Sequence, residues 1–267
     1  MNRPPSPAAG NWLAAAAAGA AVGLLGGLIG LGGAEFRLPL LIGVFAFAAL
    51  HAVILNKAMS LIVVATALPA RLLSMPVSAI TDHWGVIVNL LAGSLIGAYL
   101  GATWATRMAS RTLYRVLAAL LVLMAAALAA DHVAVLHPVV LPELAQLVAG
   151  VLAGIGIGIV AALMGVAGGE LLIPTIVVLF GIDIKTAGSL SLAVSLPTML
   201  VAFARYSQDR SFGVLAANKT FVLAMAAGSV LGTLAGGALL GVIPEGVLIP
   251  LLAVLLLASS VKVWHHQ

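Results

Sequence analysis

Long apolar runs with very few charged residues between them are the feature of this sequence that most restricts its fold. Of the 267 residues, 63% are hydrophobic and only 7% are charged. An ordinary soluble domain has about 25% charged residues and needs them to keep its surface hydrated. A water-soluble monomer and a disordered chain are therefore excluded. The sequence predicts an integral membrane protein, with the lipid bilayer as its surroundings.

The remaining composition excludes several classes of function. The net charge is only +4 and the basic residues are scattered, so no nucleic-acid-binding surface is expected. The chain has no cysteine, and its histidines lack the spacing of metal ligands. The motifs of zinc proteases, serine hydrolases and P-loop ATPases are also missing. We therefore predict neither an enzyme with catalytic residues, nor a metal site, nor a cofactor.

The apolar segments predict an all-α, polytopic transmembrane bundle with about 8–10 membrane segments. A helix needs about 20 apolar residues to cross a bilayer, and the second and third segments of each half are shorter. These short pairs, 38–50 with 58–74 and 171–180 with 190–204, could be tilted spans, broken helices or re-entrant hairpins. The complete set comprises residues 11–33, 38–50, 58–74, 85–106, 113–130, 145–168, 171–180, 190–204, 214–239 and 247–262.

The two halves of the chain match at a constant offset of 135 residues. GLGGAEFRLP (30–39) aligns with GVAGGELLIP (165–174), and two further windows align at the same offset. These are AVILNKAMSL with AGSLSLAVSL, and AGSLIGAYLG with AGSVLGTLAG. The three windows share 14 identities in 30 positions. We therefore predict two transmembrane repeats, 1–135 and 136–267.

The duplication and the positive charges together predict the topology. The N-terminal apolar stretch could pass for a signal peptide, but its repeat counterpart is internal, so we expect a retained helix. If each repeat crosses an odd number of times, most Lys and Arg fall on one side, as the positive-inside rule requires. Only Arg37, Arg71 and Lys185 would then lie outside, and the side of Lys57 depends on whether the short pair counts as two spans or as one hairpin. We expect an inverted repeat with both termini cytoplasmic. The cytoplasmic set would be Arg3, Arg107, Arg111, Arg115, Arg205, Arg210, Lys219 and Lys262.

A glycine cluster followed by glutamate and proline occurs once in each repeat. Glycines can break a helix, and the N–H groups exposed at such a break can bind an anion. The prolines would start or kink the next half-helix. Alternatively, each cluster could lie at a helix end near the headgroups. Because the motif occurs twice, we favour two breaks inside the protein that together bind a substrate. The residues are Gly30, Gly32, Gly33, Glu35 and Pro39, and Gly165, Gly168, Gly169, Glu170 and Pro174.

The two glutamates suggest a link to protons. An ionised carboxylate beside an anion site would repel the anion, whereas a protonated one would not. We therefore expect Glu35 and Glu170 to carry or gate protons, with electrostatic capping of a helix N-terminus as the alternative.

The second repeated window is polar for its position within an apolar segment. It supplies candidate side-chain donors for an anion: Asn56, Lys57 and Ser60 in the first repeat, and Ser191 and Ser195 in the second. Lys57 could neutralise a bound oxyanion, or it could extend to the membrane surface. The hydroxyl groups could also bond only to their own helix.

Glycine stripes with a spacing of four residues follow in each repeat. They occur at 93, 97 and 101 and again at 228, 232 and 236, and they predict close helix packing. The stripes are also candidates for a homodimer interface.

The chain resembles the TauE/SafE family of membrane permeases, which is named for sulfite export. The resemblance rests on GLLGGLIGLGGAEFRLPLL (23–41) and GIVAALMGVAGGELLIPTI (158–176), and on the segments 52–61 and 187–196. It covers essentially the whole chain in two copies. It implies a permease that moves sulfite, sulfoacetate or a related small anion.

We therefore predict a secondary transporter for a sulfur oxyanion or an organosulfonate. It would work by alternating access, driven by the membrane potential or the proton gradient. A passive anion channel and a non-transporting membrane assembly module are the alternatives.

Overall fold

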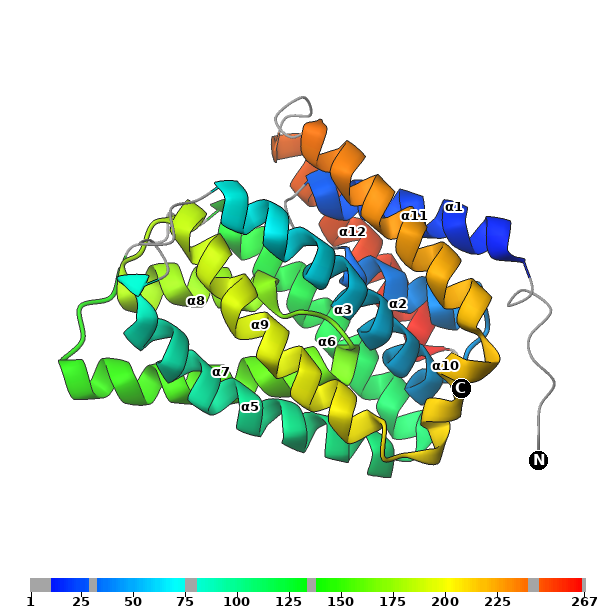
Figure 1. Cartoon of the computed structure of the whole chain (residues 1–267), viewed down its shortest axis with the longest axis horizontal. Coiled ribbons are helices and arrows are strands. Elements are labelled where there is room, and N and C mark those ends of the chain that lie inside the picture. The colour runs from blue at the N-terminus through cyan, green and yellow to red at the C-terminus, as the bar shows by residue number, and fades with distance from the viewer. Residues whose placement is uncertain (1–10, 29–32, 75–80, 134–137, 240–244, 266–267) are drawn as a thin grey trace.

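The computed structural model describes residues 11–28, 33–74, 81–133, 138–239 and 245–265, and these form a bundle of helices with no strand among them (Figure 1). The elements in chain order are α1 (Trp12–Leu28), α2 (Ala34–Gly43), α3 (Ala49–Ser74), α5 (Trp84–Arg107), α6 (Ser110–Val133), α7 (Glu143–Met164), α8 (Gly169–Phe180), α9 (Ile184–Tyr206), the 3₁₀ helix η1 (Arg210–Phe212), α10 (Gly213–Ala217), α11 (Lys219–Ala238) and α12 (Glu245–Trp264).

Six of the described helices are long and apolar enough to cross a membrane: α3, α5, α6, α7, α9 and α11. The helices α2 and α8 have only 10 and 12 residues, which correspond to about 15–18 Å of helix, or roughly half a bilayer. Each short helix is followed by a long one, α3 or α9. The short pairs of the sequence therefore resolve into a half-length helix followed by a helix of spanning length.

The predicted boundary between the segments 38–50 and 58–74 is in the wrong place. The chain turns between Gly43 and Ala49, and α3 then runs without interruption through Asn56 and Lys57. The polarity of these two residues predicts a gap between two segments. They are instead buried in the protein, where a polar side chain can be bonded without ending the helix.

The helices of the two halves begin at matching positions. The starts of α2 and α8, of α3 and α9, of α5 and α11, and of α6 and α12 are all 135 residues apart. The contacts follow the same pairing. The helix α1 packs along α11 as α7 packs along α5, and α2 contacts α12 as α8 contacts α6. A pseudo-twofold relation between the halves would produce this pattern. The repeat boundary itself remains a prediction from the sequence.

The glycine stripes bring these helix pairs into close contact. A Cβ atom at Gly93 or Gly97 of α5 would lie 2.0–2.1 Å from a carbonyl oxygen of α7. Gly228 and Gly232 of α11 have the same relation to α1, where the distance would be 2.1 Å. The prediction that the stripes pack helices is confirmed. The stripes are covered within one chain, so a homodimer would have to use another surface.

The packing also fixes the direction of the helices. Gly19 and Gly23 of α1 face Met225 and Ser229 of α11 in rising order, so these two helices run parallel. Figure 1 shows α1 and α5 running in opposite directions, so α11 also runs opposite to α5, its counterpart in the first repeat. This is the arrangement expected of two repeats with opposite orientations.

The close approach of α5 and α7 gives a prediction about stability. Gly97→Ala would place a methyl group 2.1 Å from the carbonyl oxygen of Ile155, so the helices would have to separate. We expect the free energy of unfolding to fall by about 1–3 kcal/mol, measured by thermal or denaturant unfolding in detergent.

Gly156→Ala on α7 is the matched control for this experiment, because a Cβ there would meet nothing within 4 Å. It should leave stability unchanged or raise it by up to about 1 kcal/mol through helix propensity. Equal losses in the two variants would contradict the proposed close packing.

Candidate functional site

The helical path breaks at Gly33, directly before α2, and between Gly165 and Gly168, directly before α8. Gly33 precedes α2 with φ +68°, and Gly168 precedes α8 with φ +87°. Gly165 ends α7 with φ +72°. These left-handed conformations suit glycine because other residues there bring Cβ close to the following carbonyl oxygen. Gly169 is the first residue of α8, whereas Gly30 and Gly32 lie outside the described residues.

No side chain caps either of the two short helices at its N-terminus. The N–H groups of Phe36 and Arg37 donate to Gly33, and those of Leu171 and Leu172 donate to Gly168. The first N–H groups of each short helix are the ones such an end leaves available for other acceptors.

The two breaks meet on α3. The amide nitrogen of Asn56 donates to the carbonyl oxygen of Ala34, after the first break, and to that of Met164, before the second break, both at 3.0 Å. A Cβ at Gly165 would lie 2.5 Å from the carbonyl oxygen of Val53, one turn earlier on α3. Residues more than 100 positions apart in the chain are thus held together by one buried amide.

Lys57, the next residue of α3, also links the halves. Its ammonium group donates to the carbonyl oxygens of Ala161 and Val166 at 2.8 and 2.7 Å, at the C-terminal end of α7. The residue is 0% exposed. The alternative that Lys57 extends to the membrane surface is therefore wrong, because backbone carbonyls at the end of α7 and just after it accept hydrogen bonds from its ammonium group inside the protein.

Arg37 of α2 is buried inside the protein. The distribution of positive charges predicted that it lies on the external side, but its side chain is 0% exposed. One terminal nitrogen, Nη1, donates to Asn56 Oδ1 at 3.4 Å and to Ser60 Oγ at 3.3 Å. A signal was present in the sequence, because Arg37 lies between Glu35 and Pro39, which both recur in the second repeat as Glu170 and Pro174.

The two glutamates belong to the same group of residues, in which Glu35 is buried and Glu170 is partly buried. Glu35 and Glu170 each occupy the first turn of a short helix, and their carboxyl groups interact with each other. Glu35 also interacts electrostatically with Arg37, and Glu170 with Lys57. Both oxygens of Glu35 and the Oε2 atom of Glu170 are buried without a hydrogen-bond partner. We call Glu35, Arg37, Asn56, Lys57 and Glu170 the charged cluster.

The hydroxyl groups of the second repeat contribute less to this cluster. Ser191 donates to the carbonyl oxygen of Gly188 in its own helix, the local bond that the sequence left open as an alternative. A Cβ at Gly169 would lie 3.9 Å from Ser191 Oγ, so this hydroxyl lies beside the second break. Ser195 follows one turn later on α9 and is 1% exposed.

The prediction that Pro39 and Pro174 could start their helices is wrong. Each lies inside, as the sixth residue of α2 or α8. A proline has no N–H, so the carbonyl groups of Glu35 and Glu170, four residues earlier, lose their helical donors. The prolines therefore leave polar backbone atoms free next to the two glutamates.

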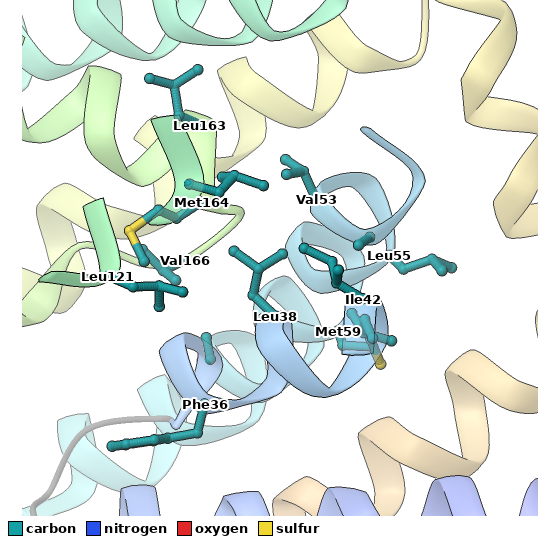
Figure 2. Packing of buried hydrophobic residues seen from close by; sticks show 14 of the residues in the cluster. Phe36, Leu38, Ile42, Val53, Leu55, Met59, Leu121, Leu163, Met164 and Val166 are labelled. Atoms are coloured by element: carbon teal, nitrogen blue, oxygen red, sulfur yellow. The ribbon is translucent and has the colours of Figure 1, made fainter. Parts of the chain in front are cut away.

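Apolar side chains enclose the charged cluster. Figure 2 shows Leu38 of α2 lying between Val53 of α3 and the segment with Met164 and Val166. These four residues are at most 1% exposed. Glu35, Arg37, Asn56 and Lys57 are themselves at most 2% exposed, and surroundings with little water strengthen their electrostatic interactions. Within the described part of the chain, no group of three or more His, Asp or Glu residues could hold a metal ion.

Comparison with known proteins places this arrangement in a family. The family model of the sulfite exporter TauE/SafE matches residues 1–128 and 132–263, which is nearly the whole chain. The search of curated proteins and the search of solved structures each gave no match. On the strength of the family match, and with the twin glycine motifs inside the matched residues, the chain belongs to the sulfite exporter TauE/SafE family.

Proposed function

We propose that this protein is a secondary transporter that moves a sulfur oxyanion or an organosulfonate, such as sulfite or sulfoacetate, by alternating access. Membership of the family implies a membrane transporter of sulfur anions rather than an enzyme. The observation that carries the finer proposal is the meeting of the two glycine breaks at Asn56, beside buried groups of both charges.

The hydrogen bonds between the halves suggest how access would alternate. Asn56 and Lys57 hold backbone carbonyls of the second half while remaining part of the first. If the halves move against each other, these bonds break and their donors become available to an anion. In transporters with inverted repeats, substrate sites lie at such helix breaks near the bilayer midplane. The backbone N–H groups of the breaks, together with Ser60, Ser191 and Ser195, would complete the anion site.

The orientation follows from the positive charges. The ends of α5, α9 and α12 and the starts of α6 and α11 lie on the same side of the molecule (Figure 1). These positions carry Arg107, Arg111, Arg205, Lys219 and Lys262. We assign this side to the cytoplasm of a cell whose inner membrane holds the protein.

The energy source would be the membrane potential or the proton gradient. A charge that crosses 100 mV exchanges about 2.3 kcal/mol, so a divalent anion would exchange about 4.6 kcal/mol. An inside-negative potential alone would therefore favour export.

The test is a flux measurement with purified protein in liposomes, preceded by thermal-shift screening against sulfite, sulfate, thiosulfate, sulfoacetate and taurine. A true ligand stabilises the folded state in proportion to RT ln(1 + [L]/Kd). We expect sulfite flux to saturate and to be accelerated by sulfite on the opposite side. Flux without saturation or acceleration would indicate a channel. No ligand-dependent stabilisation and no flux would contradict the proposal.

The role proposed for the glutamates has its own test. In the double variant Glu35→Gln, Glu170→Gln, neither side chain can bind or release a proton, so sulfite flux should lose its response to an imposed pH gradient. The measurement is flux at varied external pH and constant internal pH.

Glu143→Gln is the control for this pair, because Glu143 is an exposed residue in the first turn of α7. It should respond to the pH gradient as the unaltered protein does. If the double variant retains the full pH response, the two carboxyl groups cap helices and carry no protons.

A further inference from the structure

The guanidinium group of Arg37 combines complete burial with unused donors. The side chain is 0% exposed, and its Nε and Nη2 atoms are buried without any hydrogen-bond partner. The bonds of Nη1 to Asn56 and Ser60, at 3.4 and 3.3 Å, are long for hydrogen bonds of a charged donor. A buried cation with unpaired N–H groups is unfavourable unless something else accepts them.

The other buried cation of the charged cluster differs in this respect. Lys57 donates two short bonds to backbone carbonyls, at 2.7 and 2.8 Å. Asn56 likewise uses its amide group on two carbonyls. Lys57 and Asn56 therefore hold the two breaks together, whereas Arg37 is held only through Nη1.

The free atoms of Arg37 form a geometrically defined edge. Nε and Nη2 lie on the same side of the planar guanidinium, and their N–H groups point in parallel. This edge matches two oxygens of one oxyanion, which it can bind through two parallel charge-assisted hydrogen bonds. The bonds of Nη1 to Asn56 and Ser60 orient the edge from the opposite side of the group.

The second repeat has no equivalent of this group. The position 135 residues after Arg37 is Leu172, which is 1% exposed and packs among Ile87, Leu90 and Ile176. The pseudo-twofold relation therefore does not produce a second cationic edge, and one anion would bind on the side of α2 and α3.

We propose that the Nε–H and Nη2–H groups of Arg37 bind two oxygens of the transported sulfur oxyanion. This inference rests on the proposed function and names the side chain that selects the substrate. Glu35 interacts with Arg37 in this conformation. An incoming anion would therefore have to compete with the Glu35 carboxylate for Arg37, or bind when Glu35 is protonated.

The test is calorimetric titration of the purified protein with sodium sulfite and, separately, with sodium chloride at equal ionic strength. Chloride is a single atom and cannot bridge the two N–H groups. Arg37→Lys keeps the positive charge and loses the edge, so sulfite affinity should fall by about tenfold or more. Its selectivity for sulfite over chloride should fall with it.

Arg205→Lys serves as the matched control. Arg205 donates to Thr103 and lies over the ring of Tyr99, away from the charged cluster. It should bind sulfite as the unaltered protein does. If Arg37→Lys does not fold, Arg37→Gln is titrated in its place, with the same expected loss.

The outcomes separate the two proposals. Unchanged sulfite affinity in the folded Arg37 variant would overturn the assignment of Arg37 while leaving the transporter intact. If the unaltered protein binds no sulfite, sulfoacetate or thiosulfate, the proposed function fails, and the assignment of Arg37 fails with it.

Discussion

Asn56→Leu is expected to lower the free energy of unfolding by about 2–6 kcal/mol, because two buried carbonyl oxygens would lose their donor at about 1–3 kcal/mol each. The affected carbonyls are those of Ala34 and Met164, which flank the two breaks. Leucine has a similar length but no polar atom, so it cannot replace the amide. The measurement is denaturant unfolding in detergent, followed by sulfite flux in liposomes, which we expect to be abolished.

Ser191→Ala is the control for this prediction. Ser191 occupies the position in the second repeat that corresponds to Asn56, and its hydroxyl bonds only to Gly188 in its own helix. The loss of that local bond should change stability by about 1 kcal/mol or less. If the two variants are equally stable, the link through Asn56 does not hold the breaks together.

Gly165→Ala is expected to have the second large effect, because it strains the backbone and also displaces α3. The residue has φ +72°, which costs an alanine about 1–2 kcal/mol. The new Cβ would lie 2.5 Å from the carbonyl oxygen of Val53 and 3.0 Å from the backbone nitrogen of Lys57. These are backbone atoms, so the second break must move away from α3. We expect a total loss of about 2–5 kcal/mol in unfolding experiments.

Gly169→Ala, in the same break, is the matched control. Its φ is not positive, and its nearest neighbour would be Ser191 Oγ at 3.9 Å, an ordinary contact. This variant should be about as stable as the unaltered protein. A comparable loss at both glycines would show that the break tolerates no side chain anywhere, rather than depending on the contact with α3.

Several features could be predicted from sequence because they follow from local patterns. Apolar runs predicted helices for α5, α7 and α11 to within a few residues, since bilayer thickness fixes the length of such a run. The four-residue spacing of glycines predicted close packing, because residues at this spacing share one helix face. The constant offset between the halves also predicted where equivalent helices begin.

Burial of charged residues could not be predicted in the same way. Arg37 was predicted on the external side, and extension to the membrane surface was one of two alternatives for Lys57, because a charged residue in an apolar run usually lies at a membrane boundary. The structure buries both, and the partners that make this tolerable are distant in sequence. Lys57 is paired with carbonyls more than 100 residues away, and no local pattern contains that information.

The sequence by itself determined that this is a multi-pass membrane protein built from two similar halves, and that each half has a glycine break followed by a glutamate. These properties depend on composition, spacing and offset, which are local or repetitive. Only the tertiary structure decided that both breaks meet at Asn56, that Lys57 pins α7, and that Arg37 keeps two unpaired donors beside Glu35. The physical reason is that a buried polar group needs a hydrogen-bond partner, and tertiary packing decides which group that is. The partners can be distant in sequence, and neither local sequence identifies the other.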